Sequence, residues 1–376
     1  MGLVRCLGIG VQSTLHFAGG TMPANDAIQE RRSEFDVSNT VDVSDPTAVR
    51  NAVTELFLDL YPHAAVDPLW LAFHDFERMF TGADPDYHGV DTAYHDIQHS
   101  LDMTLAMARL IMGYERGVEA TDRLGAERAM LGLVTSLFHD AGYLRHREAD
   151  RDQRHGAQFT LRHVSRSSRF LGGYLSRVGL GHWGNVAQQI VHFTGYEIDL
   201  ERLELEDPRD SAAGHLLGTA DLMAQMADRC YLEKCRDRLF PEFVLGGIAI
   251  EDNNGESLVR YRSGKDLLIK TLDFYQNSAR YRLEKTFGRA YRYIEVLHHG
   301  DNPYVTFIQK NMTYLSGLVS SNNWSGLRRQ PPCFTAEPDS EARITRLAVQ
   351  HIKQLARQKK IRLRGNDAQS PLPATT

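Results

Sequence analysis

Cysteine is scarce in this sequence, with four in 376 residues. None of the four belongs to a CxxC pair, which argues against a disulfide framework or a thiolate zinc site and fits a reducing, cytoplasmic compartment. Long hydrophobic runs are also missing. The most apolar stretches, 131–138 and 243–250, are far shorter than the roughly 20 residues that a membrane-spanning helix needs, so we expect no membrane span.

An excess of charge of one sign is likewise absent. Lys and Arg number 43 and Asp and Glu 48, giving a formal net charge of −5. This balance provides no general attraction to nucleic acid or to an anionic membrane, and we expect neither as a partner. The sequence contains no GxxxxGK[ST], HExxH or GxSxG motif, which excludes the usual signals of P-loop, metalloprotease and serine-hydrolase sites.

The composition and the apolar spacing predict a helical protein. The 42% hydrophobic and 24% charged content is typical of a soluble, folded chain. Asp45-Pro46 and Asp67-Pro68 each place a capping carboxylate before a proline, which favours a helix start. Apolar residues recur every three or four positions and predict helices over 46–60, 68–80, 93–115, 122–141, 152–177, 182–194, 211–238, 265–298, 303–318 and 339–361. The expected fold class is therefore all-α, a multi-helix bundle.

The domain organisation follows from the same pattern. Residues 1–44 lack sustained periodicity and are expected to form a flexible N-terminal tail. A single all-α domain is expected over 45–362, and residues 363–376 are expected to be a disordered C-terminal tail. Within the domain, 239–262 is either a loop or a short hairpin, because NNG between two apolar runs is a turn signal.

Sixteen histidines are the unusual feature of the composition, and some stand in patterns suited to metal binding. His95 and His99 are four residues apart, so on a helix they project from one face. His139 is followed by Asp140, an imidazole and a carboxylate that together offer nitrogen and oxygen ligands to a divalent cation. Asp221 lies in an otherwise apolar helical stretch, where an unpaired carboxylate is costly. These features in this order predict a metal site.

Each feature also has a plainer interpretation. A histidine pair at this spacing is more often a pair of surface or packing residues. Asp221 is equally explained by a basic partner such as Arg229, and Asp228 competes with it as the helical carboxylate. The three features together are much harder to obtain by chance than any one alone.

The sequence of these motifs resembles the HD superfamily of metal-dependent phosphohydrolases over residues 90–230. The first motif, Tyr94-His95-Asp96-Ile97-Gln98-His99, is most similar to the Tyr-His-Asn-x-x-His motif of class I cyclic nucleotide phosphodiesterases. The chain departs from that pattern at Asp96, where the family has Asn, and at Tyr143, where the family has His.

The resemblance implies a role for each residue. His95 would be the general acid that protonates the leaving oxygen. The first metal ion would be held by His99, His139, Asp140 and Asp221. Asp140 would also bridge to a second ion, and mixed His and carboxylate ligation admits Zn, Mn, Fe or Mg.

Two further histidines lie between the His-Asp pair and Asp221. In other branches of the superfamily this region supplies additional metal ligands or phosphate contacts, so the resemblance implies such a role for His163 and His192. The alternative is that each is a capping or core residue. Arg166 and Arg169 follow His163 and either contact a phosphate or remain solvated.

These observations lead to one functional hypothesis and two alternatives. The leading hypothesis is a metal-dependent phosphohydrolase that hydrolyses a phosphodiester such as a 3',5'-cyclic nucleotide, with a metal-activated hydroxide and His95 as general acid. One alternative is an HD-type nucleotide or nucleoside monoester phosphohydrolase. The other is a non-catalytic HD module that binds metal and nucleotide as a sensor. The expected partner is a small phosphate ester, and the oligomeric state stays open.

Overall fold

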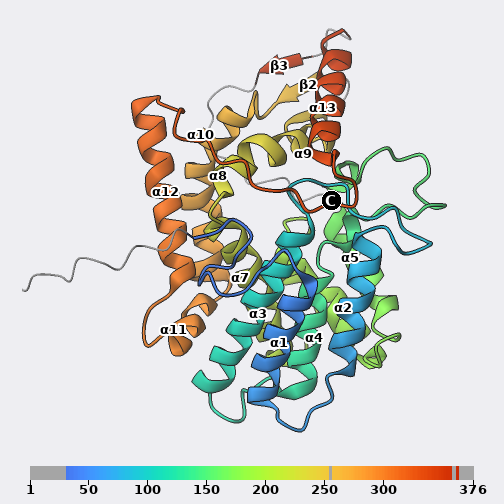
Figure 1. The fold of residues 1–376 in the computed structure, drawn as a ribbon, viewed down its shortest axis with the longest axis vertical. Coiled ribbons are helices and arrows are strands. Elements are labelled where there is room, and N and C mark those ends of the chain that lie inside the picture. Colours follow the sequence, from blue (N-terminus) through green and yellow to red (C-terminus); the bar gives the residue numbers. More distant parts are fainter. Residues whose placement is uncertain (1–30, 254–255, 358–360, 364–376) are drawn as a thin grey trace, which may run out of the picture. The chain divides into compact units, whose positions relative to one another are not determined.

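The chain is predominantly helical, as the sequence predicts (Figure 1). A computed structural model describes residues 31–253, 256–357 and 361–363. Its α-helices are α1 (Pro46–Leu60), α2 (Asp67–Phe80), α3 (Ile97–Gly117), α4 (Gly125–Leu137), α5 (His163–Tyr174), α6 (Gly184–Ile190), α7 (Pro208–Ala227), α8 (Tyr231–Lys234), α9 (Phe240–Leu245), α10 (Gly264–Phe274), α11 (Tyr293–Leu297), α12 (Pro303–Ser321) and α13 (Ser340–Arg357). Among the described helices, none combines the length and apolar character that crossing a membrane requires.

Helix α3 runs through the middle of the bundle and packs against α1, α4, α7 and α11 (Figure 1). It is buried along almost its whole length, including the polar side chains of Asp102 and Arg109. A helix surrounded on all sides has no solvent-facing stripe, which explains why its residues are mainly small or apolar. Because α4 and α7 flank α3, residues at the ends of these helices come together in space.

Two prolines start helices as expected, but their caps differ. Asp45 accepts a hydrogen bond from the Thr47 amide and caps α1, as predicted. Asp67 is already inside the first turn of α2, and Val66 occupies the capping position without a side-chain bond. The predicted cap at Asp67 is therefore wrong. Its carboxylate still lies at the positive end of the helix dipole.

Several long predicted helices are broken. Residues 152–177 contain a short 3-10 segment, η2 (Gly156–Phe159), before α5. Residues 211–238 are divided because the backbone of Asp228 leaves the helical conformation and its carboxylate accepts a hydrogen bond from the Cys230 amide. Periodicity continues across such breaks because the apolar face stays buried on both sides of them.

The 239–262 segment contains both a helix and a hairpin. Its first part forms α9, which the sequence did not predict. Strands β1 (Ile250–Asn253) and β2 (Glu256–Val259) then pair antiparallel, and β3 (Ile361–Leu363) adds to β2 in parallel. The hairpin alternative is thus realised, although residues 254–255 at its expected turn lie outside the described residues.

The predicted tail boundary at residue 44 is wrong. Phe35 and Asp42 form a β-bridge, and Val37 and Val43 belong to the buried core. Asp36 is fully buried, where desolvation would raise its pKa, but Arg109 at 2.7 Å and backbone amides hold that pKa well below its usual range. This ion pair ties the segment to α3. Residues 1–30 and 364–376 of the predicted tails lie outside the described residues, and Leu363 belongs to β3.

Candidate metal centre

Four of the predicted ligands converge in the structure. They come from α3 (His99), from the turn after α4 (His139 and Asp140) and from α7 (Asp221). Nε2 of His99 lies 3.3 Å from Nε2 of His139, 3.4 Å from Asp221 Oδ1 and 3.5 Å from Asp140 Oδ2. His139 Nε2 is 3.2 Å from Asp140 Oδ2 and 4.0 Å from Asp221 Oδ1. The buried group His99, His139 and Asp221 could bind a metal ion.

One atom of the cluster tests whether a cation fits. Asp140 Oδ2 is buried and has no hydrogen-bond partner among the described residues, although two imidazole nitrogens lie within 3.5 Å of it. A buried carboxylate oxygen without a partner is costly. A divalent ion among the nitrogens and carboxylates would compensate this oxygen, so the residues present fit a metal.

Local sequence explains how the His-Asp pair is presented. His139 follows the last turn of α4, and its Nδ1 donates a hydrogen bond to the Ser136 carbonyl at 2.8 Å. This bond orients the ring and leaves Nε2 facing the cluster. Gly142 follows in the 3-10 turn η1 (Ala141–Tyr143), where a Cβ would lie 1.9 Å from the His163 carbonyl oxygen. Only glycine permits this close approach of η1 to α5.

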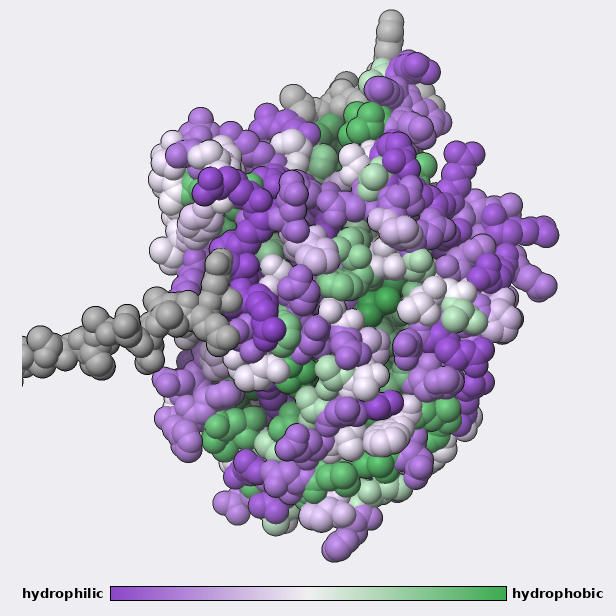
Figure 2. Space-filling view, viewed as in Figure 1, coloured by the Kyte–Doolittle hydropathy of each residue, from purple (hydrophilic) through white to green (hydrophobic). Residues whose placement is uncertain are grey.

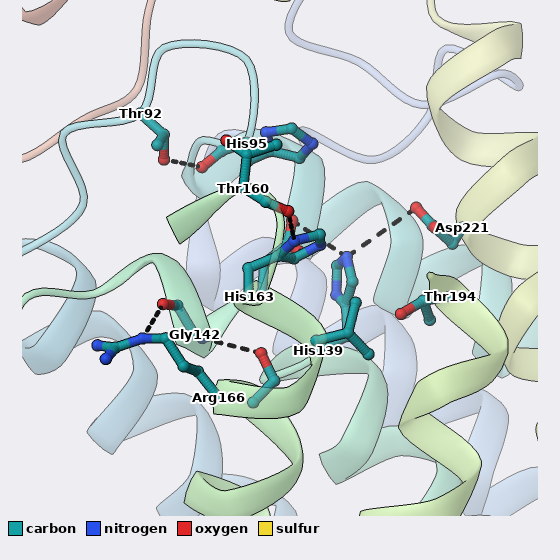
Figure 3. Close-up of polar contacts among 12 residues, drawn as sticks. Thr92, His95, His139, Gly142, Thr160, His163, Arg166, Thr194 and Asp221 are labelled. Atoms are coloured by element: carbon teal, nitrogen blue, oxygen red, sulfur yellow. Dashed lines mark hydrogen bonds and ion pairs between the residues drawn. The ribbon is translucent and has the colours of Figure 1, made fainter. Parts of the chain in front are cut away.

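That approach brings His163 to the centre. Its Nδ1 donates to the Thr160 carbonyl at 2.7 Å (Figure 3). Its Nε2 lies 3.7 Å from Asp140 Oδ1. Burial lowers the pKa of His163 against the opposing effect of Asp140, which favours the neutral, ligating form. Asp140 therefore has one oxygen facing His99 and His139 and the other facing His163.

His192 is placed differently. It lies in η4 (Val191–Thr194), and among the described residues it makes no hydrogen bond or ion pair with the cluster. Burial lowers its pKa, and Glu197, which also lies 3.6 Å from His163 Nδ1, opposes that shift. A role for His192 at a second ion stays a prediction.

The sequence analysis expected His95 and His99 to project from one helix face, and this prediction is wrong. Helix α3 begins at Ile97 because Asp96 caps it, accepting a hydrogen bond from the His99 amide at 3.1 Å. His95 thus lies before the helix. Its ring centroid is still 5.9 Å from that of His99, and Thr92 donates a hydrogen bond to the His95 carbonyl at 2.7 Å (Figure 3).

Glu242 of α9 is the partner of His95 that the sequence analysis missed. His95 Nδ1 lies 2.6 Å from Glu242 Oε2, and the other carboxylate oxygen accepts from the Tyr94 amide at 2.6 Å. Burial would lower the pKa of His95, but the charge and hydrogen bond of Glu242 outweigh it and raise that pKa. Tyr143 stacks on His95 at 4.6 Å, where the family pattern has His.

Arg166 and Arg169 are the remaining sequence candidates, and His155 is a further histidine near them. Arg166 donates to the carbonyls of Gly142 and Leu144 and pairs with Asp150 at 2.8 Å, so its guanidinium is engaged by protein groups (Figure 3). Arg169 is exposed. His155 is fully buried and caps η2 by accepting from the Ala157 amide.

Space around the centre is uneven. A cavity of about 20 Å³, room for about one water molecule, adjoins His99 and is bordered by Tyr94 and Gln225. The side chains of His95 and His163, which do not line this cavity, keep 15% and 18% exposure. Solvent therefore reaches the centre from the side of His95 and His163.

Gln225 connects Asp221 to this cavity wall. It donates to Asp221 Oδ1 at 3.2 Å and accepts from the Tyr94 hydroxyl at 3.3 Å. Because a partner that orients a ligating carboxylate tunes metal affinity, Gln225→Ala is expected to weaken metal binding by about 10- to 100-fold. Competitive titration with a metal-sensitive dye measures this change. The exposed Gln276→Ala is the control, and equal affinities in the two variants would contradict the assignment.

Metal affinity is also expected to rise with pH. Burial would lower the pKa of His139, but Asp140 and Asp221 outweigh it and raise that pKa to about 9. His139 is therefore protonated at neutral pH until an ion displaces the proton. Calorimetry at pH 7 in buffers of different ionisation enthalpy should show proton release on metal binding, and affinity should increase toward pH 9. Binding without proton release would contradict this prediction.

Comparison of the chain with models of protein families, with curated proteins and with solved structures found no match.

Proposed function

We propose that this chain is an HD-type, metal-dependent phosphohydrolase that acts on a small phosphodiester such as a 3',5'-cyclic nucleotide. The observation that carries the proposal is the convergence of His99, His139 and Asp221 on Asp140, whose buried Oδ2 has no hydrogen-bond partner in the described part of the chain. His163 at the second oxygen of Asp140 supports a centre for two ions.

The chain's own residues would supply the proton. With Nδ1 held by Glu242, His95 would present Nε2 as the donor, and its raised pKa favours the protonated form that a general acid needs. Tyr143, stacked on both His95 and His163, fixes the plane of each ring. The leaving alkoxide of the ester would take the proton from His95.

The ligand set would hold divalent ions such as Zn, Mn, Fe or Mg. When bound, such ions neutralise phosphate charge and lower the pKa of water, so that it can attack phosphorus near neutral pH. His99, His139, Asp140 and Asp221 would hold the first ion, and Asp140 with His163 would contribute to a second. The side of the centre that solvent reaches, near His95 and His163, is where the ester would enter.

The experiment is a panel of cyclic nucleotides, linear diesters and monoesters, tested with Mn, Mg, Fe or Zn added to metal-stripped protein. We expect metal-dependent hydrolysis of a cyclic nucleotide. Turnover restricted to monoesters would instead select a nucleotide or nucleoside monoester phosphohydrolase. Tight metal binding without any turnover would overturn the enzymatic proposal in favour of a metal- and nucleotide-binding sensor module.

A further inference from the structure

Residues 331–336, here called the strap, belong to the connection between α12 and α13 and lie along residues 90–97, which include His95. Two backbone hydrogen bonds join the strap to these residues, one on each side of His95 in the sequence: from the Ala336 amide to the Val90 carbonyl at 2.9 Å, and from the Ile97 amide to the Phe334 carbonyl at 3.0 Å. The connection crosses the face drawn in Figure 1, and hydrophilic residues predominate around it in Figure 2.

The strap has little apolar burial to hold it in place. None of its six residues is buried, and Pro331 and Pro332 have no N–H to donate. Gly89 allows the other end of the strap to come close, because a Cβ at Gly89 would lie 2.5 Å from that of Ala336. The strap therefore depends on polar contacts that other elements provide.

Arg238 holds the first part of the strap. It lies in η6 (Cys235–Leu239), and its side chain is 2% exposed. The guanidinium donates hydrogen bonds to the carbonyls of Pro331 and Pro332, the latter at 3.1 Å, and Nε donates to Glu341 at 2.8 Å. Since Glu341 lies in the first turn of α13, one buried cation joins the strap to the start of that helix.

Asp96 joins the strap to His95. Its Oδ1 accepts from the His99 amide and caps α3, while its Oδ2 accepts from the Phe334 amide at 3.1 Å. Arg238 Nη1 lies 4.0 Å from the same Oδ2. Because Asp96 directly follows His95, the backbone that bears the imidazole is held from the strap as well as from α3.

Helix α13 supports the other member of the proton-donor pair. It packs against α9, which carries Glu242. Ile344 of α13 is fully buried in a cluster with Ala93 and Ala157, and Ala93 lies two residues before His95. The strap and α13 thus support both His95 and Glu242, whereas the metal ligands come from α3, from the turn after α4 and from α7.

We propose that Arg238 and Asp96 are positioning residues that act through the strap to hold His95 against Glu242. The inference rests on the proposed function, because it takes His95 as the proton donor. A displacement of about 1 Å in a positioned group can cost about 100-fold in rate. Loss of the strap contacts should therefore slow the reaction and leave the metal ligands in place.

Arg238→Met and Asp96→Asn test the two contacts. Met keeps an unbranched side chain and loses the guanidinium. Asn caps a helix as well as Asp does, but it offers one acceptor oxygen in place of two, so the Phe334 amide loses its partner. We expect each variant to lower kcat about 10- to 100-fold, with KM and metal content unchanged. The control is Arg346→Ala, which removes only an exposed ion pair with Asp339 and should keep the wild-type kcat.

Combination with His95→Gln separates positioning from stability. If the two residues act through His95, each variant should lower the residual rate of His95→Gln by less than about twofold. A merely structural role would lower the rate equally in both backgrounds, and that result would overturn the proposal. An unchanged kcat in both variants, or loss of metal from a folded variant, would also overturn it. Asp96→Asn is nearly isosteric, so it decides the matter if melting curves show that Arg238→Met is unfolded.

Hydrogen exchange tests the strap without any need for turnover. The Tyr94 amide is bonded to Glu242, and the Ile97 amide is bonded to the strap. Both amides should exchange faster in Asp96→Asn and in folded Arg238→Met, while amides in the middle of α3 stay protected. Faster exchange in a chain whose wild type has no turnover would reject the enzymatic function and leave the support of His95 by the strap standing. Unchanged exchange at both amides would overturn the strap assignment whatever the activity.

Discussion

Replacing Asp140 by Asn is expected to remove the bound metal and to lower phosphate-ester turnover at least about 10³-fold. Asp140 lies between His99 and His139 on one side and His163 on the other. Burial would raise its pKa, but His139 and its other histidine neighbours hold that pKa well below the usual range, so the group is a carboxylate at any working pH. Asn keeps the shape and loses the charge that a bridging ligand needs.

The measurement is metal content by mass spectrometry together with the rate on the substrate that the panel identifies. Asp152→Asn is the matched control, because Asp152 is exposed on the loop that follows the centre. That variant should keep both metal and activity. A folded Asp140→Asn variant with wild-type metal content would show that Asp140 is not a required ligand and that His99, His139 and Asp221 hold the ion without it.

The ligand cluster was predictable because each part of it is encoded locally. The His139-Asp140 pair stands at the end of an apolar helical run, and Asp221 is a carboxylate within another. Burial forces both helices against α3, so the polar residues on their inner faces meet. The sequence therefore indicates which residues gather, although it does not indicate the distances between them.

Glu242 could not be predicted in the same way. It lies 147 residues from His95, and α9 around it was assigned to a loop or hairpin. Its one signal is a carboxylate among apolar neighbours in FPEFVL, a pattern that Asp221 shares. The partner of such a buried charge depends on tertiary contacts, which periodicity does not contain.

Local capping also decides the geometry at His95. Asp96, three residues before His99, is an N-terminal capping residue, so the helix starts after it and His95 lies outside the helix. The four-residue spacing of His95 and His99, considered without this cap, predicts a shared helix face. Residues 35–43 mislead in the opposite way. Their turns lack periodicity, which is typical of a flexible tail, yet Asp36 binds Arg109 and holds them against α3.

Replacing His95 by Gln is expected to lower turnover about 10²- to 10⁴-fold while metal content stays at the wild-type level. His95 contacts Glu242 and Tyr143, and among the described residues it makes no hydrogen bond or ion pair with His99, His139, Asp140 or Asp221. Metal analysis and rate measurements on the same preparation separate a lost proton donor from a lost ligand. If metal content falls as it does in Asp140→Asn, His95 is itself a ligand.

Glu242→Gln tests the source of the proton. Burial alone would lower the pKa of His95, and Glu242 is the main group that raises it. A neutral Gln should therefore lower this pKa. A general acid works only while protonated, so the rate declines as pH rises through its pKa, and the alkaline limb of the pH-rate profile should move to lower pH. The exposed pair Glu127 and His182, 3.5 Å apart, offers Glu127→Gln as the control, in which the profile should not move. The contrary result is an alkaline limb that does not move in Glu242→Gln, while His95→Gln still shows its large loss of turnover. In that case Glu242 only orients the His95 ring, and other groups determine the pKa of His95.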